Sequence, residues 1–315
     1  MPHACEGERE GNHSRMAIEP PQRLVRALGE TQPDGGADWL DKLPELVRLT
    51  VDLRELTVER VQAPGGRSSV VLLVRQTDGT PAVLKLAPQW ARPESERVAL
   101  AHWGGFGAVQ LLDADTERGV LLLERLHPEM SARALPEAKA LLEAVGTLRR
   151  LWVKPPAGHC LETVAARTGR QAEAMRASVA ADPEAAPLVE AALAAREELL
   201  ATPAEERLLH GTLRQSKILA GERMPWLAVG PDPVVGECAF DLARLVRDRV
   251  EDLIAAPSGT AITRRRVKWL AESLDLDQQR LRGWTLFRAV ESGVRARRVG
   301  RPQDAELLLE FAGWL

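Results

Sequence analysis

The spacing of apolar residues divides the chain into two regions. Between residues 55 and 124 they alternate with polar residues or form short runs, which is typical of strands. After residue 126 they recur every three or four positions, which is typical of helices. We therefore expect a loose N-terminal arm at 1–20, a helical lead-in with a β-rich lobe at 21–126, and a helical lobe at 127–315.

Five strands are predicted in the β-rich lobe, with one helix at 94–103 inserted after the third strand. The Asp78-Gly79 pair is typical of a hairpin turn, so the first strands should be antiparallel. The predicted strands are 55–62, 68–76, 80–87, 108–112 and 120–124.

Helices are predicted on both sides of this lobe. Two short ones precede it, at 22–28 and 39–47; Pro33-Asp-Gly-Gly should break the chain between them, and Pro44 should lie near a helix start or a junction. The larger lobe should contain helices at 136–152, 161–178, 187–200, 241–254, 264–274, 277–298 and 304–315. The fold class is therefore α+β, with a small antiparallel β lobe and a larger, mostly helical lobe.

Composition narrows the function classes. The chain has 315 residues, of which 45% are apolar, so it can bury a large core. Its net charge of -3 gives no general reason to expect binding to nucleic acid or membrane. No apolar run approaches the roughly 20 residues that span a bilayer, and residues 1–20 lack the apolar core of a secretory signal. We expect a cytoplasmic protein.

Cysteine usage agrees with a reducing compartment. Cys5, Cys160 and Cys238 are odd in number and far apart, and they offer no Cys-x-x-Cys spacing for a metal.

Lys85 is the first candidate for nucleotide binding. It lies in the strand AVLKLA, which is similar to the V-A-I-K strand of kinases, where a Lys contacts the nucleotide phosphates and a Glu on the next helix holds it. Glu96 is the expected partner and Glu94 the alternative. A lysine in a strand is otherwise a solvated edge residue.

Two further segments fit a nucleotide site. Gly65 and Gly66 lie between the first two strands, where a loop over phosphates belongs, although a plain β-turn is the alternative because no G-x-G-x-x-G is present. Glu124 and Leu126 end the last strand, where the backbone of a hinge would face an adenine ring. An ordinary linker is the alternative there.

The stretch 208–241 has the layout of a kinase catalytic loop followed by a metal-binding strand end. A loop of the form H-R-D-x-x-x-x-N supplies a carboxylate that accepts the proton of the substrate hydroxyl and, five residues later, an amide that holds magnesium. In this chain those two places hold Thr212 and Lys217.

Together these segments resemble the aminoglycoside and hydroxyurea antibiotic resistance kinase family, which includes streptomycin kinases. The resemblance runs from about residue 39 to 290. It implies a two-lobed protein-kinase-like fold and transfer of the γ-phosphate of ATP to a hydroxyl of a small molecule. The matching segments are WLDKLPELV at 39–47, AVLKLA at 82–87, HWGGFGAVQLL at 102–112, GVLLLERL at 119–126, LLHG at 208–211, PWLAV at 225–229, PVVGECAFDLARL at 233–245 and LRGWTLFRAV at 281–290.

The chain departs from this family at the positions that carry the chemistry. The family reads H-G-D-L-H-x-G-N where this chain has residues 210–217, so the resemblance implies that Thr212 replaces the catalytic base and Lys217 the magnesium-binding Asn. Gly230 stands where the family has a metal-binding Asp before Pro. The frame of the loop is retained, in His210, Gly211 and the bracing residue Asp241.

These replacements predict a catalytically degenerate protein, a pseudokinase. A positioned general base contributes roughly 10²- to 10⁴-fold in rate, and the metal neutralises charge on the transferring group. We expect binding of a nucleotide or small molecule, or regulation of a protein partner, with any ATP binding weak or independent of magnesium. Lys217 could itself contact phosphate.

Two other functions remain open. The chain is alternatively an active ATP-dependent phosphotransferase acting on a hydroxyl of an antibiotic-like molecule, with Asp232 or Glu237 as a displaced metal ligand. It is also compatible with an interaction protein whose cleft has collapsed.

A basic segment, Arg295-Ala-Arg-Arg298 with Arg301, lies where the family's C-terminal helices help form the acceptor pocket. A cationic aminoglycoside needs carboxylates there. The segment is either a solvated basic helix end or a surface for an anionic ligand or partner.

Overall fold

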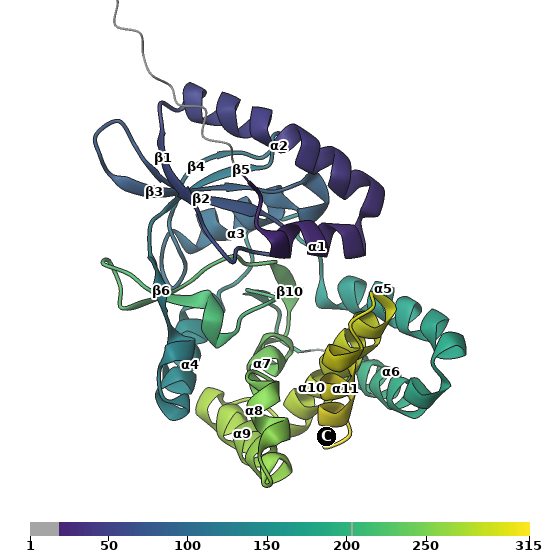
Figure 1. The fold of residues 1–315 in the computed structure, drawn as a ribbon. Helices are drawn as coiled ribbons and strands as arrows, with labels where there is room; N and C mark the ends of the chain where they lie inside the picture. The colour runs from purple at the N-terminus through teal and green to yellow at the C-terminus, as the bar shows by residue number, and fades with distance from the viewer. Residues whose placement is uncertain (1–18, 203) are drawn as a thin grey trace, which may run out of the picture.

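The computed structural model describes residues 19–202 and 204–315 and has two lobes (Figure 1). A small lobe is built on an antiparallel sheet and a larger lobe mostly on helices, which confirms the predicted α+β class. The arm predicted at 1–20 lies almost entirely outside the described residues, as does Cys5. Among the described residues, no helix combines the length and the apolar character needed to cross a membrane.

The sheet of the small lobe has five antiparallel strands in the order β1-β2-β3-β5-β4. Its alternating side chains enter different hydrophobic clusters, as a period of two requires. Val120 and Leu122 of β5 pack with α1 and α2, while Leu121 and Leu123 pack on the opposite side with α3. The elements are α1 Gln22–Thr31, α2 Pro33–Leu53, β1 Thr57–Val61, β2 Val70–Arg75, β3 Pro81–Leu86, α3 Pro93–Trp103, β4 Leu111–Asp115 and β5 Val120–Glu124.

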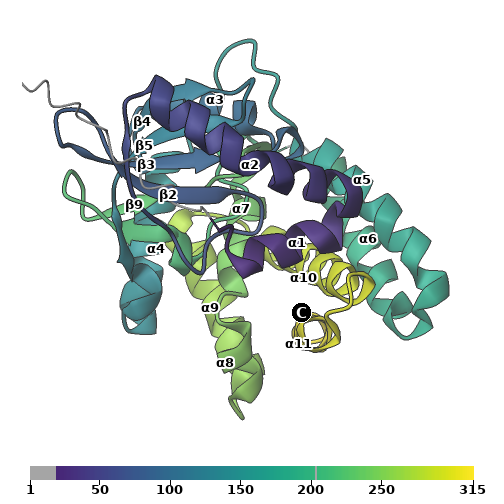
Figure 2. The same cartoon turned by 45° about the horizontal axis from the view of Figure 1, so that its top comes forward.

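Helix α2 corrects two predictions (Figure 2). The chain breaks at Gln32, before the Pro-Asp-Gly-Gly segment, and that segment forms the first turn of α2, where the missing N–H of Pro33 removes no helical hydrogen bond. Pro44 lies inside the helix. Burial of Leu43 and Val47 against the sheet holds the helix together across the lost hydrogen bond, so tertiary packing outweighs local propensity.

The larger lobe is arranged around the long helix α10. Its Trp284 is fully buried and meets Phe240 and Phe287 edge to face, with ring centroids 5.2 and 6.0 Å apart. Such contacts favour one packing arrangement of these helices. The helices are α4 Glu137–Leu151, α5 Val164–Ser178, α6 Ala186–Ala201, α7 Cys238–Val246, α8 Val250–Ala255, α9 Gly259–Leu274, α10 Gln278–Arg298 and α11 Pro302–Ala312.

Short strands between the lobes were not predicted, because three residues carry too little periodicity. Strands β6, β8 and β9 form one antiparallel sheet and β7 pairs with β10; the catalytic-type loop connects β7 to β8. Their bounds are β6 His127–Ser131, β7 Arg207–Leu209, β8 Ile218–Ala220, β9 Trp226–Ala228 and β10 Val234–Gly236.

Several predicted elements have different bounds, and for two of them the structure shows the cause. The strand predicted at 108–112 begins later, as β4, because Ala108 bridges to Ala228 of the other lobe. The helix predicted at 241–254 is two helices, α7 and α8, separated at Arg249, whose φ is 57°. The Arg249 guanidinium bonds the side chain of Gln215 at 2.6 Å, which ties this turn to the catalytic-type loop.

Gly119, just before β5, lies very close to Ala87, just after β3, and a comparison with Gly79 tests this approach. Gly119 has a φ of 73° and a Cβ there would lie 1.9 Å from the Ala87 carbonyl oxygen, whereas Gly79 has a φ of 83° with nothing within 4 Å. We expect Gly79→Ala to lower the free energy of unfolding by roughly 1–2 kcal/mol from backbone strain alone. Gly119→Ala should lower it by about 3 kcal/mol or more. Urea unfolding measures both, and equal losses would contradict the steric account.

Candidate functional site

Asp241 holds the frame of the catalytic-type loop. Its buried carboxylate accepts hydrogen bonds from the backbone N–H groups of His210 and Gly211, each at 2.9 Å, and from the indole of Trp152 at 3.3 Å. Burial raises the pKa of Asp241 above its usual value, although the adjacent Arg288 opposes this. The loop is therefore anchored at its first two residues.

The two anchored residues are themselves constrained. Burial and the nearby Lys217 lower the pKa of His210 well below its usual value, so the ring is neutral and its Nε2–H donates to the Val229 carbonyl at 3.2 Å. Gly211 has a φ of 79°, and a Cβ there would lie 2.0 Å from the Asp232 carbonyl oxygen. Only glycine fits this approach.

Lys217 joins the three positions that the sequence comparison with the kinase pattern predicts to be replaced. It ends the 3₁₀ turn 215–217, and its Nζ donates to Thr212 Oγ1 at 2.7 Å and to the Gly230 carbonyl oxygen at 2.7 Å. Gly230 follows β9 with a φ of 59°, and a Cβ there would point at the same ammonium, 3.9 Å away. A cation thus lies where both segments meet.

The ammonium of Lys217 is in an environment that disfavours its charge. Withdrawal from water, together with the neighbouring Arg214 and Lys85, lowers the pKa of Lys217 to about 7. An anion placed beside this group would raise that pKa, because it would favour the charged form.

Lys85 and Glu96 form an ion pair across β3 and α3, with side chains 12% and 5% exposed. Glu94, the alternative partner, instead accepts hydrogen bonds from Arg97 and from Thr116. Because an ammonium has three donors, Lys85 retains donors for a ligand.

A cavity of about 470 Å³ lies between the lobes; we call it the nucleotide-type cleft. Apolar side chains line one part of it and the cations Lys85 and Lys217 another, and its volume is typical of small-molecule sites. The predicted site residues that line it are Gly65, Gly66, Lys85, Glu124, Leu126, Thr212, Lys217 and Gly230. Glu96, His210, Gly211, Asp232 and Asp241 are not among its lining residues.

Glu124 of the predicted hinge already has partners within the protein for both its backbone N–H and its side chain. The N–H of Glu124 donates to the Gln110 carbonyl at 3.0 Å, and the Glu124 carboxylate pairs with Arg223 at 3.1 Å.

The donors around this cleft do not fit a magnesium ion. Asp232 Oδ1 is held by the guanidinium groups of Arg92 and Arg167. Glu237 binds Arg280 at 2.7 Å and the indole of Trp284. Across residues 19–202 and 204–315 no group of three or more His, Cys, Asp or Glu side chains could hold a metal ion.

An ion-pair network behind Asp232 was missed from the sequence. Arg92, at the start of α3 in the small lobe, pairs with Glu162 and with Asp232 of the larger lobe. Although burial opposes it, hydrogen bonds from Arg170, Arg167 and Arg92 lower the pKa of Glu162 to about 2. These partners are far apart in sequence, so no local pattern could have revealed them.

The two-lobed fold, the strand lysine paired with a helix glutamate, and the Asp-braced loop define a protein-kinase-like fold. The profile of the aminoglycoside/hydroxyurea antibiotic resistance kinase family matches residues 54–300. The chain belongs to this family.

Relatives of known name support the assignment. The chain is 34% identical to a streptomycin 6-kinase of Streptomyces glaucescens over 279 residues, covering 88% of this chain and 90% of the relative. It is 35% identical to a hydroxyurea phosphotransferase of Kitasatospora aureofaciens over 318 residues, covering 94% and 87%.

Solved structures agree on the fold. A thermostable mutant of an aminoglycoside phosphotransferase, in ternary complex with ADP and hygromycin B, superposes with a TM-score of 0.59 at 14% identity and covers 84% of this chain and 96% of that chain. This likeness confirms the kinase-like two-lobed fold.

The environment of Lys217 predicts a specific pH dependence of stability. An unfolded lysine keeps its proton up to about pH 10, whereas folded Lys217 releases it near pH 7. The unfolded state therefore binds more protons in this window, and stability rises with pH through it. Relative to Lys217→Met, we expect the wild-type free energy of unfolding to increase by roughly 2–4 kcal/mol between pH 7 and 9.5.

Urea unfolding at the two pH values measures this difference. Lys42→Met, which removes an exposed lysine on α2, is the matched control and should leave the pH dependence unchanged. A wild-type curve parallel to that of Lys217→Met would show that the Lys217 environment does not disfavour its charge.

Proposed function

We propose that this chain is a catalytically degenerate member of its family, a cytoplasmic pseudokinase that binds a nucleotide between its lobes without transferring phosphate. The observation that carries the proposal is the Lys217 ammonium, which bonds Thr212 and Gly230 and so places a cation among all three replaced positions. In this role the ligand-bound protein, and not a phosphorylated product, would act in a small-molecule pathway or on a protein partner.

Proton transfer has no suitable group at the family's base position. The hydroxyl of Thr212 is a very weak base near neutral pH, and it already accepts a hydrogen bond from Lys217. Loss of a positioned base removes roughly 10²- to 10⁴-fold in rate.

Charge in the cleft favours phosphate without metal. A magnesium ion near Gly230 would meet the Lys217 ammonium and would have to displace its two hydrogen bonds, since like charges repel strongly away from bulk water. An ammonium is instead a compact point charge that binds phosphate directly. We assign Lys85 and Lys217 to the nucleotide phosphates, and the apolar wall with Leu126 to the base.

An active phosphotransferase, acting on a hydroxyl of an antibiotic-like molecule, is the second candidate. The names of the relatives favour it, because streptomycin 6-kinase and hydroxyurea phosphotransferase are transferases. Metal binding would then require Asp232 to leave Arg92 and Arg167 and turn into the cleft.

Calorimetry with ATP separates the candidates. We expect ATP to bind, and magnesium to leave the affinity unchanged or to lower it, because magnesium neutralises the phosphate charge that Lys85 and Lys217 attract. Lys85→Ala should weaken binding by about tenfold or more. Lys139→Ala, an exposed lysine on α4, is the control and should change little.

Three results would count against the proposal. ATP binding that tightens strongly with magnesium favours the active enzyme, as does transfer of labelled phosphate to streptomycin or hydroxyurea that Lys85→Ala abolishes. Absence of any ATP binding favours a protein whose cleft serves another purpose.

Restoring the family residues should restore the metal dependence. The combined variant Thr212→Asp, Lys217→Asn and Gly230→Asp removes the ammonium and adds two carboxylates. A Cβ at position 230 would have only the Lys217 ammonium within 4 Å, at ordinary contact distance, and Asp tolerates the left-handed backbone there. We expect magnesium to tighten ATP binding to this variant but not to wild type. Thr212→Asp alone should not respond, because Lys217 would pair with the new carboxylate. If the triple variant and wild type respond alike to magnesium, the ammonium is not what excludes the metal.

A further inference from the structure

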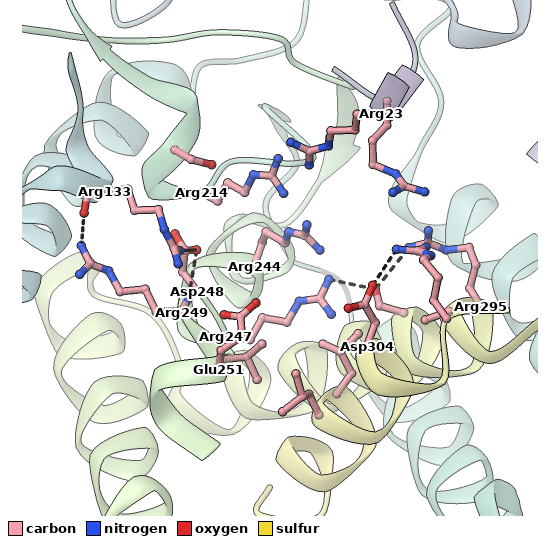
Figure 3. A pocket seen from close by; sticks show the side chains of 18 residues that line it. Arg23, Arg133, Arg214, Arg244, Arg247, Asp248, Arg249, Glu251, Arg295 and Asp304 are labelled. Carbon is pink, nitrogen blue, oxygen red and sulfur yellow. Dashed lines mark hydrogen bonds and ion pairs between the residues drawn. The ribbon is translucent and has the colours of Figure 1, made fainter. Parts of the chain in front are cut away.

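A second cavity, of about 510 Å³, adjoins the nucleotide-type cleft and is lined by nine arginines and three carboxylates (Figure 3). We call it the arginine basin. The arginines come from both lobes: α1, the β1–β2 loop, the catalytic-type loop, the α7–α8 region and the end of α10. They are Arg23, Arg67, Arg133, Arg214, Arg244, Arg247, Arg249, Arg295 and Arg301, and the carboxylates are Asp248, Glu251 and Asp304.

Some of these arginines are already neutralised. Arg67 pairs with Glu30 at 2.6 Å, Arg295 with Glu291 at 2.8 Å and Arg301 with Asp304 at 2.9 Å. Arg133 lies 3.8 Å from Asp248, and the donors of Arg249 bond the amide oxygen of Gln215 and two carbonyl groups. These contacts account for part of the positive charge and leave the rest of the basin uncompensated.

The remaining arginines lack acceptors within the part of the chain that the structure describes. Side chains of Arg23, Arg214 and Arg244 make neither a hydrogen bond nor an ion pair with residues 19–202 or 204–315, and the Nε of Arg214 is buried. Figure 3 shows all three guanidinium groups directed into the same space. Burial lowers the pKa of Arg214, and the positive charge of Arg23 adds to this effect.

Arg247 is the strongest indication of a missing ligand. Its side chain lines the basin with the whole residue only 5% exposed, and it donates to Ser292 Oγ at 2.9 Å, while its other terminal nitrogen, Nη1, is buried without a partner. Burial of a guanidinium costs free energy unless acceptors surround it. An anion in the cavity would offset this buried positive charge.

We propose that the arginine basin binds a small polyanion, a molecule carrying two or more phosphate groups, without a metal ion. Guanidinium groups match phosphate oxygens in pairs, and a cavity of this size encloses a small molecule. A cationic aminoglycoside would be repelled.

The inference goes beyond the nucleotide proposal and does not depend on it. The basin has its own residues, such as Arg247 and Arg295, that do not line the cleft, although Arg23, Arg214 and Arg244 belong to the wall that the two cavities share.

Calorimetry with sodium tripolyphosphate, in the absence of magnesium, tests the inference on the full chain. We expect the tightest tripolyphosphate site to be the basin, with binding at least about tenfold tighter than that of inorganic phosphate because several guanidinium groups act together; any binding at the phosphate positions of the cleft should be weaker. Arg214→Gln and Arg244→Gln should each weaken binding by about tenfold. Arg264→Gln, an exposed arginine of α9 outside both cavities, should leave it within about twofold.

Two variants locate the ligand. Arg295→Gln changes the basin alone: it leaves the Glu291 carboxylate without its cation and should weaken tripolyphosphate binding by about threefold or more. Lys85→Ala changes the cleft alone and should leave this binding within about twofold. The reverse pattern would place the polyanion in the cleft and overturn the proposal. Unchanged binding in the Arg214 and Arg244 variants would also overturn the proposal. So would displacement of tripolyphosphate by single-stranded DNA at equal phosphate concentration, because the basin would then bind a nucleic acid and not a small polyanion. Streptomycin binding that depends on Arg244 would also contradict it.

Discussion

The ammonium group of Lys217 is the interaction on which the character of the site depends. It bonds the side chain of Thr212 and the carbonyl of Gly230, so the three residues that depart from the family pattern contact one another. The three residues are compatible with one another, because the Lys217 ammonium needs hydrogen-bond acceptors and would repel a metal ion placed beside it. Asp241 anchors the loop that brings them together, so the frame of the loop does not depend on the identities of residues 212 and 217.

Both cavities are lined by positively charged side chains of the protein. In the nucleotide-type cleft Lys85 and Lys217 provide the positive charge, and in the arginine basin several guanidinium groups do, of which Arg214 and Arg244 lie on the shared wall. A cationic antibiotic would instead require carboxylates at such places. Under the two proposals these charges serve anion binding, and an occupant of one cavity would alter the repulsion among the cations of the other.

How far the sequence predicts this structure depends on whether the signal is local. Short apolar runs separated by turn residues predict the strands of the small lobe, the loop spacing points to positions 212 and 217, and the family resemblance adds position 230. The contact among those positions could not be predicted, because it requires the loop and β9 to meet in space. Arg23, Arg247 and Arg301 likewise converge from distant segments with no shared pattern, and α2 continues through Pro44 because packing on the sheet outweighs propensity.

The most direct test of the central claim is a crystal structure of the chain grown with ATP and manganese, with anomalous scattering used to locate the metal. We predict that Lys217 Nζ contacts a phosphate oxygen and that no anomalous peak lies among Thr212, Lys217 and Gly230. A manganese peak at that point, with the Lys217 side chain turned away and Asp232 in the cleft, would contradict the account.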